Sequence, residues 1–415
     1  MNPKAILLIA DGMADRPLKE LGWKTPLEVA RKPAMDRIAA NGICGIIDPI
    51  APGIPPGSDT ATLAMLGYDP SKVYKGRGAL EALGMGLVVL SGDVAFRCNF
   101  ATVDKDLVVL DRRAGRIANE DASLLSSKLQ RVKLFKYPDV KFTFKNAVQH
   151  RAALIIHGPK LSTAVSDSDP ESDGKQVLEI EALDGTKEAQ RTAAIVNTLM
   201  HEFHEVLKDD PVNKARARRG LPEANAILCR SAGTVSQMPS LQDKFGIESA
   251  CIAAVSLIRG VCRVAGMKLI DVKGATGTLE TDYQAKAKAA VRALKSNDFV
   301  LVHVKATDVA SHDGNAHLKI DATEHVDEML SYIIDHADMA STYLAVTADH
   351  TTSSRTRNHE GDPVPVAIMG LDVRRDDVTE FGERTCAMGG LNRIRGIDLM
   401  SILMGLLGKT KKFGS

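Results

Sequence analysis

Three short apolar runs in this chain each lead to an aspartate. Residues 5–10, Ala-Ile-Leu-Leu-Ile-Ala, are followed directly by Asp11. Two later runs, near the C-terminal end, lead to Asp308 and Asp349. Continuous apolar runs of this length are typical of strands buried on both faces of a parallel sheet. The pattern therefore predicts an α/β fold with a mostly parallel central sheet flanked by helices.

Histidines accompany the second and third of these aspartates. His312 lies four residues after Asp308, so the two side chains share a face if the segment turns helical. His350 follows Asp349 directly, and His359 comes shortly afterwards. Functional groups collect outside the carboxyl ends of parallel strands, so we expect these side chains and the first aspartate in one crevice.

The residue types in this cluster point to divalent metal. Carboxylate oxygen and imidazole nitrogen are the usual ligands of zinc and manganese. On an extended backbone the adjacent side chains of Asp349 and His350 point to opposite sides, which suits two ions better than one. Taken singly, an Asp after a strand is often a helix N-cap or a turn former, and a lone His is usually a packed or surface group. The same pattern at three strand ends favours a metal site.

A loop rich in proline and glycine, residues 51–57, leads to Ser58. Residues 60–66 are predicted to form a helix that Gly67 and Pro70 end. Ser58 then lies at a helix entrance, where backbone N–H groups and the helix dipole stabilise an anion, whether a serine alkoxide or a bound phosphate. A plain N-cap serine has the same sequence pattern, so both interpretations stay open. A nearby dication favours the nucleophile, because coordination lowers the pKa of the hydroxyl.

Composition limits the kind of partner. Lys plus Arg number 53 and Asp plus Glu 52, so the net charge of +1 offers no general field for nucleic acid or a membrane surface. The basic run at residues 214–219 has no aromatic stacking pattern, and we interpret it as a solvated helix end. A small molecule is the expected partner, and the oligomeric state stays open.

The cysteines and the apolar runs indicate the compartment. Six scattered cysteines show neither a Cys-x-x-Cys pair nor a disulfide framework. The sequence has no secretion-type N-terminal segment, and no apolar run approaches the roughly 20 residues that span a bilayer. We expect a soluble, cytoplasmic protein with reduced thiols. The length of 415 residues suggests about two or three domains.

The order of these residues resembles a known superfamily. Asp11, Ser58, the Asp308/His312 pair, the Asp349/His350 pair and His359 resemble, in that order, the two-metal site of the alkaline phosphatase superfamily. Four motifs look more closely like those of the archaeal-type, cofactor-independent phosphoglycerate mutases. They are Ala10-Asp-Gly-Met-Ala-Asp15, Pro56-Gly-Ser-Asp-Thr-Ala61, Lys75-Gly-Arg-Gly78 and Gly390-Leu-Asn-Arg-Ile-Arg-Gly396. The resemblance runs nearly end to end.

The resemblance implies an alkaline-phosphatase-like core with two divalent ions. One ion would be held by Asp308, His312 and His359. The second would be held by Asp11, Ser58, Asp349 and His350, with Ser58 as the nucleophile. Manganese is the usual ion of the family, while zinc, cobalt or magnesium also suit a mixed nitrogen and oxygen ligand set.

The resemblance also implies a smaller α/β cap domain inserted in the core. The core would comprise residues 1–76 and 230–415, and the cap residues 77–229. Residues 92–103 alternate like a strand of the cap, and residues 250–260 look like a strand and helix of the returning core. Candidate ligands for substrate phosphate and carboxylate are Arg97, Arg112, Arg113 and Arg116, with Arg259 and Lys273 of the core.

Guanidinium groups match such anions bidentately, although a solvated basic turn is the alternative for the cap arginines. Asp167 and Asp169 are candidate acid/base groups, because moving a proton between substrate hydroxyls needs a positioned carboxylate or imidazole. They are equally suited to a turn. Glu171 stands where the family often has an aromatic or imidazole residue.

The implied activity is a metal-dependent isomerisation. A 2,3-bisphosphoglycerate-independent phosphoglycerate mutase interconverts 3-phosphoglycerate and 2-phosphoglycerate, in glycolysis and gluconeogenesis, through a phosphoserine intermediate. Closure of the cap on the core would keep water from the phosphoserine. One alternative is another metal-dependent phosphomonoesterase, phosphomutase or phosphotransferase of the same superfamily. A second is a metal-binding scaffold protein without catalysis.

Overall fold

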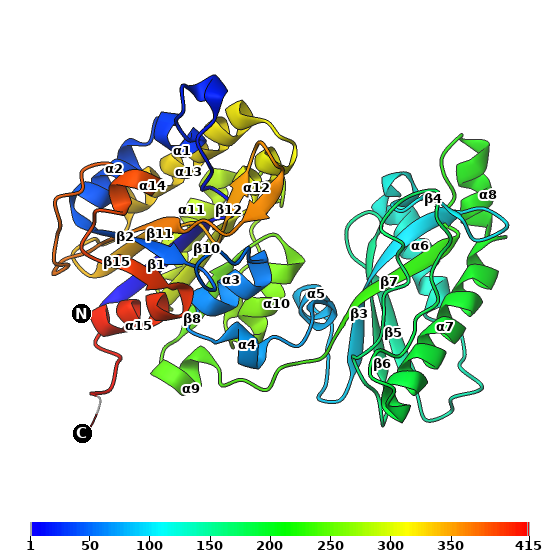
Figure 1. The fold of residues 1–415 in the computed structure, drawn as a ribbon. Coiled ribbons are helices and arrows are strands. Elements are labelled where there is room, and N and C mark those ends of the chain that lie inside the picture. The colour runs from blue at the N-terminus through cyan, green and yellow to red at the C-terminus, as the bar shows by residue number, and fades with distance from the viewer. Residues whose placement is uncertain (1, 413, 415) are drawn as a thin grey trace. The chain divides into compact units, whose positions relative to one another are not determined.

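The computed structural model describes residues 2–412 and 414 of the chain. The chain divides into two compact units (Figure 1). Unit 1 combines Met1–Tyr74 with Met238–Ser415, and unit 2 is Lys75–Gln237. The first junction expected from the sequence, after residue 76, lies two residues inside unit 2. The second, after residue 229, lies within strand β7 (Ala226–Gly233), which belongs to unit 2.

Unit 1 is built on an eight-stranded sheet with the strand order β15-β2-β14-β11-β1-β10-β8-β9. In that order the strands are Asn392–Arg395, Gly42–Asp48, Val364–Met369, Thr342–Thr347, Lys4–Ala10, Phe299–Val304, Ser249–Ile252 and Lys268–Leu269. Strand β14 runs antiparallel to both of its neighbours, whereas every other pairing in this sheet is parallel. The predicted mostly parallel α/β sheet is confirmed.

The three apolar runs form adjacent central strands. Strand β1 pairs in parallel with β10 on one side and β11 on the other. Every residue of β10 and β11 is buried, as are the last six residues of β1. Both faces of these strands therefore pack against other elements, which explains why their sequences are continuously apolar rather than alternating.

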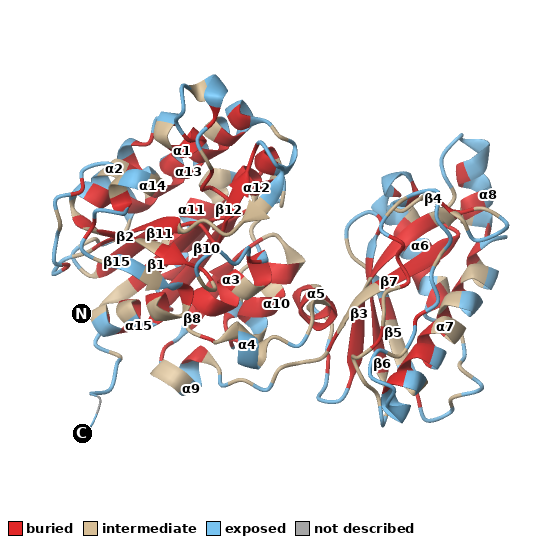
Figure 2. Ribbon diagram, viewed as in Figure 1, coloured by how far each residue is buried: buried red, intermediate tan, exposed pale blue. Residues whose placement is uncertain are grey.

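Helices flank both faces of this sheet (Figure 1). Their inward sides are buried together with the strands (Figure 2). The longer ones are α2 (Pro33–Ala40), α3 (Ser58–Met65), α10 (Ser256–Val264), α11 (Tyr283–Ala293), α12 (Ala306–His312), α13 (Ala316–His336) and α15 (Gly396–Leu406). The short ones are η1 (Lys19–Leu21), α1 (Pro26–Val29), α4 (Pro70–Val73), α9 (Leu241–Phe245) and α14 (Glu383–Cys386). In the described part of the chain, no helix combines the length and apolar character that a bilayer span needs.

Unit 2 contains a five-stranded antiparallel sheet. Four strands follow the order β4-β3-β6-β5, and β7 pairs with β3. The strands are β3 (Val94–Val103), β4 (Val109–Asp111), β5 (Lys141–Asn146), β6 (Arg151–His157) and β7; the helices are α5 (Arg77–Gly84), η2 (Ala114–Arg116), α6 (Asn119–Leu129), α7 (Lys187–Leu207) and α8 (Pro211–Arg218). The predicted alternating strand at 92–103 is confirmed as β3.

The alternation of β3 separates an apolar face from a polar one. Phe96, Cys98 and Phe100 lie in a core with residues of α6 and α7. Because successive side chains of a strand point to opposite faces, Arg97 and Asn99 lie on the other face of the sheet.

The basic run at residues 214–219 is only partly the solvated helix end that its sequence suggested. Helix α8 does end in this run, at Arg218. Arg216, however, is only 2% exposed, and its guanidinium donates to the Pro222 carbonyl and to Asp121. The interpretation was wrong for Arg216, because this guanidinium satisfies buried acceptors instead of facing water.

A buried ion pair ties helix α13 to the segment after β1. The Lys319 Nζ lies 3.0 Å from Asp15 Oδ2, and both side chains are fully buried. The same ammonium donates to the Ala14 carbonyl at 3.0 Å and to the Thr352 carbonyl at 2.7 Å. All three ammonium donors therefore have acceptors, as a buried charge requires.

We expect Lys319→Met to lower the free energy of unfolding of unit 1 by about 3–5 kcal/mol, because it leaves the Asp15 carboxylate buried without its cation. Denaturant unfolding of the full chain measures this loss. The control is Glu328→Gln, on the exposed side of the same helix, which should change stability by less than about 0.5 kcal/mol. Equal stabilities of the two variants would contradict the prediction.

Candidate metal centre

The candidate site lies at the carboxyl edge of three neighbouring strands of unit 1. The parallel register sets Ala10 beside Val304 of β10, and Ile9 beside Thr347 of β11. The segments that follow these strands therefore start side by side. They carry Asp11 after β1, Asp308 in the first turn of α12, and Asp349 after β11.

A short hairpin brings the last histidine into the same place. Strands β12 (Thr351–Ser353) and β13 (Asn358–Glu360) pair antiparallel, with Thr352 opposite His359. Because β12 begins directly after His350, the hairpin sets the His359 ring against the His350 ring, with centroids 3.7 Å apart.

The predicted ligands form two groups that share one histidine. Asp308, His350 and His359 offer ligand atoms that all lie within 4.8 Å of one another, and so do Asp11, Asp349 and His350. His312 joins the first group, since its Nε2 lies 3.3 Å from Asp308 Oδ1. The structure therefore brings together all six predicted aspartate and histidine ligands.

Ser58 belongs to the same cluster. Its Oγ lies 3.1 Å from His350 Nε2, and the residue is only 8% exposed. Ser58 is the first residue of α3, and the N-cap position is occupied by Gly57. The hydroxyl is thus directed at a candidate metal ligand and does not cap the helix.

The histidine rings are held with the same nitrogen facing inward. His312 Nδ1 lies 2.8 Å from the Arg357 carbonyl, and His359 Nδ1 lies 2.7 Å from the Pro56 carbonyl. A carbonyl only accepts, so each Nδ1 carries the proton and each Nε2 keeps its lone pair for the centre.

His350 is oriented in a comparable way by a threonine. Its Nδ1 lies 2.9 Å from Thr352 Oγ1, whose hydroxyl donates to Asp308 Oδ1 at 2.9 Å. Such partners of the ligands commonly fix the ring tautomer at metal sites.

The charge balance of the cluster also fits dications. The carboxyl groups of Asp11, Asp308 and Asp349 are buried, and the nearest cation is the Lys305 ammonium, 3.0 Å from Asp11 and 2.6 Å from Asp308. Burial, together with the nearby charge of Asp11, raises the pKa of Asp349 to about 7. The buried Asp349 Oδ2 has no hydrogen-bond partner.

The pKa of Asp11 moves in the opposite direction. Burial by itself would raise it, but the Lys305 charge and the close His303 and His350 side chains bring it below the ordinary value. The two acids differ because one ammonium cannot compensate three carboxylates. Carboxylate oxygen and imidazole nitrogen together form a donor set suited to manganese or zinc, and these ions would supply the missing positive charge.

Sequence reasoning missed several residues that hold this centre. His303, within β10, has its Nε2 3.0 Å from Asp11 Oδ2, and Lys305 follows the same strand. A histidine within an otherwise apolar run, and a lysine at its end, were the available signals. Sequence reasoning also assigned no role to Gly12. It has φ +62°, and a Cβ there would collide with Thr352 Oγ1 and lie 2.8 Å from Asp308 Oδ1.

In unit 2, Arg97 lies within a group of arginines on the polar face of the sheet. Burial, with the neighbouring Arg230 and Arg77, lowers the pKa of Arg97 to about 10, although Glu81 opposes the shift. The Nε atoms of these three arginines are buried without a hydrogen-bond partner. Sequence reasoning did not single out Arg77 or Arg230, because their proximity to Arg97 depends on how α5 and β7 pack on β3.

The remaining predicted residues of unit 2 differ in their surroundings. Arg112 binds Asp169 bidentately, at 2.7 and 2.8 Å, whereas Arg113 and Arg116 are exposed at η2. Burial would raise the pKa of Asp169, but Arg112 lowers it below the ordinary value. Asp167 instead has its pKa raised by burial, and it accepts a hydrogen bond from the Ser231 N–H at 2.7 Å.

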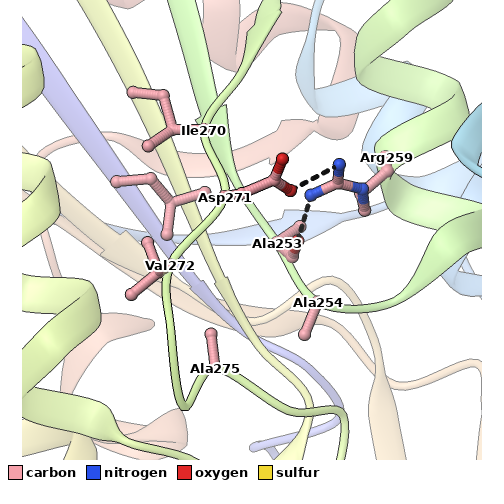
Figure 3. Close-up of a pocket in the computed structure, with 8 residues that line it drawn as sticks. Ala253, Ala254, Arg259, Ile270, Asp271, Val272 and Ala275 are labelled. Atoms are coloured by element: carbon pink, nitrogen blue, oxygen red, sulfur yellow. Dashed lines mark hydrogen bonds and ion pairs between the residues drawn. The ribbon is translucent and has the colours of Figure 1, made fainter. Parts of the chain in front are cut away.

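Of the two predicted basic residues of unit 1, Arg259 lines a small hollow (Figure 3). Arg259 Nη2 lies 2.8 Å from Asp271 Oδ1, and its Nη1 donates to the Ala253 carbonyl. The hollow measures about 240 Å³ and is lined by Ile252, Ala253, Ala254, Arg259, Ile270, Asp271, Val272 and Ala275. Lys273 is exposed next to this lining. Because β8 pairs in parallel with β10, the hollow lies at the same sheet edge as the metal centre.

Comparisons with known proteins agree on one family. A family model described as 2,3-bisphosphoglycerate-independent phosphoglycerate mutase matches residues 39–213. A relative of the same description from Methanocaldococcus jannaschii is 48% identical over 412 residues, 99% of each chain. A relative from Archaeoglobus fulgidus is 48% identical over 415 residues, again 99% of each chain.

Two solved structures share the fold over the whole chain. The PH0037 protein from Pyrococcus horikoshii is 38% identical, with a TM-score of 0.87 and complete coverage of both chains. A cofactor-independent phosphoglycerate mutase from Thermoplasma acidophilum is 37% identical, with a TM-score of 0.71, over 98% of this chain and 100% of that one.

We expect Gly12→Ala to weaken Mn²⁺ binding by roughly 10- to 100-fold, because the added methyl displaces the Thr352 hydroxyl that orients two candidate ligands. Titration calorimetry of Mn²⁺ into the metal-free protein measures this affinity. The matched control is Gly22→Ala, at φ +66° with nothing within 4 Å of the added Cβ. It carries the same backbone strain without the clash, so equal affinities of the two variants would contradict the prediction.

Proposed function

This chain belongs to the family of 2,3-bisphosphoglycerate-independent phosphoglycerate mutases, and from that premise we propose how its residues interconvert 3-phosphoglycerate and 2-phosphoglycerate. It is an isomerase that moves a phosphoryl group between two hydroxyls of one substrate. Our proposal is that Ser58 carries this group in between. The supporting observation is the Ser58 hydroxyl, placed 3.1 Å from His350 Nε2 at the start of a helix.

Two divalent ions are the proposed cofactors, with manganese as the first candidate and zinc, cobalt or magnesium as alternatives. Asp308, His312 and His359 would hold one ion, and Asp11, Ser58, Asp349 and His350 the other, with the His350 ring near both groups. When bound, the ions lower the pKa of the serine hydroxyl and offset charge on the phosphoryl oxygens.

Ser58 Oγ attacks phosphorus in line, the bond from phosphorus to the glycerate 3-oxygen breaks, and this oxygen takes up the proton that the serine loses. The start of α3 stabilises the resulting phosphoserine. The N–H groups of a first helical turn have no partner within the helix, and their dipoles favour a negative group such as a phosphoryl on Ser58. Lys305 adds positive charge at the same edge of the sheet.

Unit 2 supplies the proposed ligands for the glycerate. Arg97 and Arg230, whose buried Nε atoms have no hydrogen-bond partner, are suited to the substrate carboxylate. Further proposed contacts with the anionic substrate are Arg112, Arg113, Arg116, Arg259 and Lys273. Arg112 already binds Asp169, so its main proposed role is to position that carboxylate.

Asp167 is the proposed group that takes the proton from the glycerate 2-hydroxyl. Its raised pKa suits proton exchange better than the lowered pKa of Asp169, which is committed to Arg112. The deprotonated hydroxyl then attacks the phosphoserine. Glycerate has to stay bound throughout, because attack by water would release inorganic phosphate instead.

Ser58→Ala should lower mutase turnover by about four orders of magnitude or more, because it removes the nucleophile. The measurement is a 31P spectrum of products from 3-phosphoglycerate, with Mn²⁺ and without 2,3-bisphosphoglycerate. The control is Ser240→Ala, at the N-cap of α9, which should keep its turnover. Unchanged turnover of Ser58→Ala would remove Ser58 from its role, and inorganic phosphate as the only product of the unmodified protein would favour a phosphomonoesterase.

Asp167→Asn should reduce mutase turnover by about 10²–10⁴-fold while phosphoserine still forms, because the amide keeps the Ser231 hydrogen bond but cannot accept the proton. Rapid quenching followed by peptide mass spectrometry measures phosphate on Ser58, and the 31P assay measures turnover. Asp169→Asn serves as the comparison, with a smaller expected loss. A larger loss in Asp169→Asn would assign the proton transfer to Asp169 instead.

A further inference from the structure

The six cysteines, scattered in sequence, meet in pairs in the fold. All six belong to the described residues, are buried and are reduced. The thiols of Cys98 and Cys229 are in contact in unit 2. In unit 1 the thiol of Cys44 lies against that of Cys386, and the thiol of Cys251 against that of Cys262. The sequence did not reveal this arrangement, because it depends on how strands and helices distant in the chain pack together.

The pair in unit 2 has the best-defined geometry. The Cys98 and Cys229 Sγ atoms lie 3.5 Å apart although 131 residues separate them in the chain. Cys98 is on β3 and Cys229 on β7, directly opposite each other in the antiparallel register. Both side chains point into the same apolar core, between Phe96 and Phe100 of β3 and the helices α6 and α7.

The backbone hydrogen bonds of Cys229 show whether Cys98 and Cys229 form a hydrogen-bonded or a non-hydrogen-bonded pair of the ladder. Its N–H donates to Ser168 Oγ at 2.8 Å, and its carbonyl accepts from the Ser168 N–H at 2.8 Å. Both groups thus bond away from β3, so Cys98 and Cys229 form a non-hydrogen-bonded pair of the ladder. The Cα atoms of such pairs are typically about 4.5 Å apart, inside the range of about 4.4–6.8 Å that a disulfide needs.

We propose that Cys98 and Cys229 are a disulfide-forming site that links β3 to β7 when the chain folds in contact with a low-molecular-weight disulfide. One thiolate attacks the oxidant, which releases one thiol and leaves a mixed disulfide. The second thiolate displaces the remaining oxidant half as another thiol. The protein loses two protons and two electrons, and the oxidant disulfide is reduced to two thiols.

Burial determines when this exchange occurs. In the folded chain, burial and the neighbouring thiol raise the pKa of Cys98, so little of the attacking thiolate is present. The exchange therefore takes place while the chain folds, before β7 closes over β3. Once formed, the bond lies out of reach of reductants in the folded sheet.

The bond would stabilise most of unit 2 and the loop that carries the proposed base. It closes a covalent loop from residue 98 to residue 229, which includes α6, α7 and α8. Cys229 also anchors Ser168, which stands between Asp167 and Asp169. The disulfide would thus hold β7 in place, the strand that Asp167 and Asp169 contact.

The full chain is unfolded and reduced, then refolded in a mixture of oxidised and reduced glutathione, alkylated and digested. Mass spectrometry should find the Cys98 and Cys229 peptides cross-linked. Melting of unit 2 in this sample should lie roughly 5–15 °C above that of protein refolded with reductant alone.

Two variants assign the effect to this pair. In Cys98→Ala the difference in melting temperature between oxidised and reduced samples should disappear, whatever the absolute stability of the variant. In Cys262→Ala, the matched control from another pair, the shift should remain. The proposal is overturned if both thiols stay alkylatable after oxidative refolding, if either is found bonded to a different cysteine, or if Cys98→Ala keeps the full shift.

Discussion

The concentration of negative charge at one buried sheet edge is the constraint on which the rest of this structure depends. Parallel pairing of β1 with β10 and β11 brings the buried Asp11, Asp308 and Asp349 together, with the Lys305 ammonium as their nearby cation. Charges buried in this way are stable only when paired or bound to metal. The inward-facing imidazole nitrogens therefore complete a candidate metal site, and burial together with the Asp11 charge raises the pKa of Asp349, as expected where positive charge is lacking.

The same sheet edge also holds Ser58 in place. The chain has to reach Ser58 from β2 through the proline-rich loop, and the hydrogen bond of His359 to the Pro56 carbonyl holds that loop to the hairpin after β11. The start of α3 and the candidate metal ligands are thus connected through Pro56, two residues before Ser58. The glycine at position 12 also contributes to this arrangement. A Cβ there would collide with the hydroxyl of Thr352, which orients His350 and Asp308.

The sequence was most informative where the physical signal was local. Apolar runs that end in an acid sufficed to predict the sheet and the residues that meet at its edge, because strand burial and the position of strand ends follow from neighbouring residues. The sequence did not predict contacts that depend on packing between segments distant in the chain. Arg216 looks like part of a solvated basic run until Pro222 and Asp121 are seen to surround its guanidinium. Arg230 and the cysteine partners likewise become neighbours only through the register of β7 on β3.

A mutase and a phosphatase differ in what happens to the glycerate after its phosphoryl group has moved to the serine. Metal ligands act on the phosphoryl group and not on the glycerate. A phosphatase releases it, whereas a mutase has to hold it by its carboxylate and deprotonate its other hydroxyl. In our proposal unit 2 supplies both functions, through Arg97 and Arg230, whose buried Nε atoms have no hydrogen-bond partner, and through Asp167, which Arg112 does not hold bidentately as it holds Asp169. The proposal therefore assigns the choice between the two reactions to residues of unit 2, and not to the metal ligands.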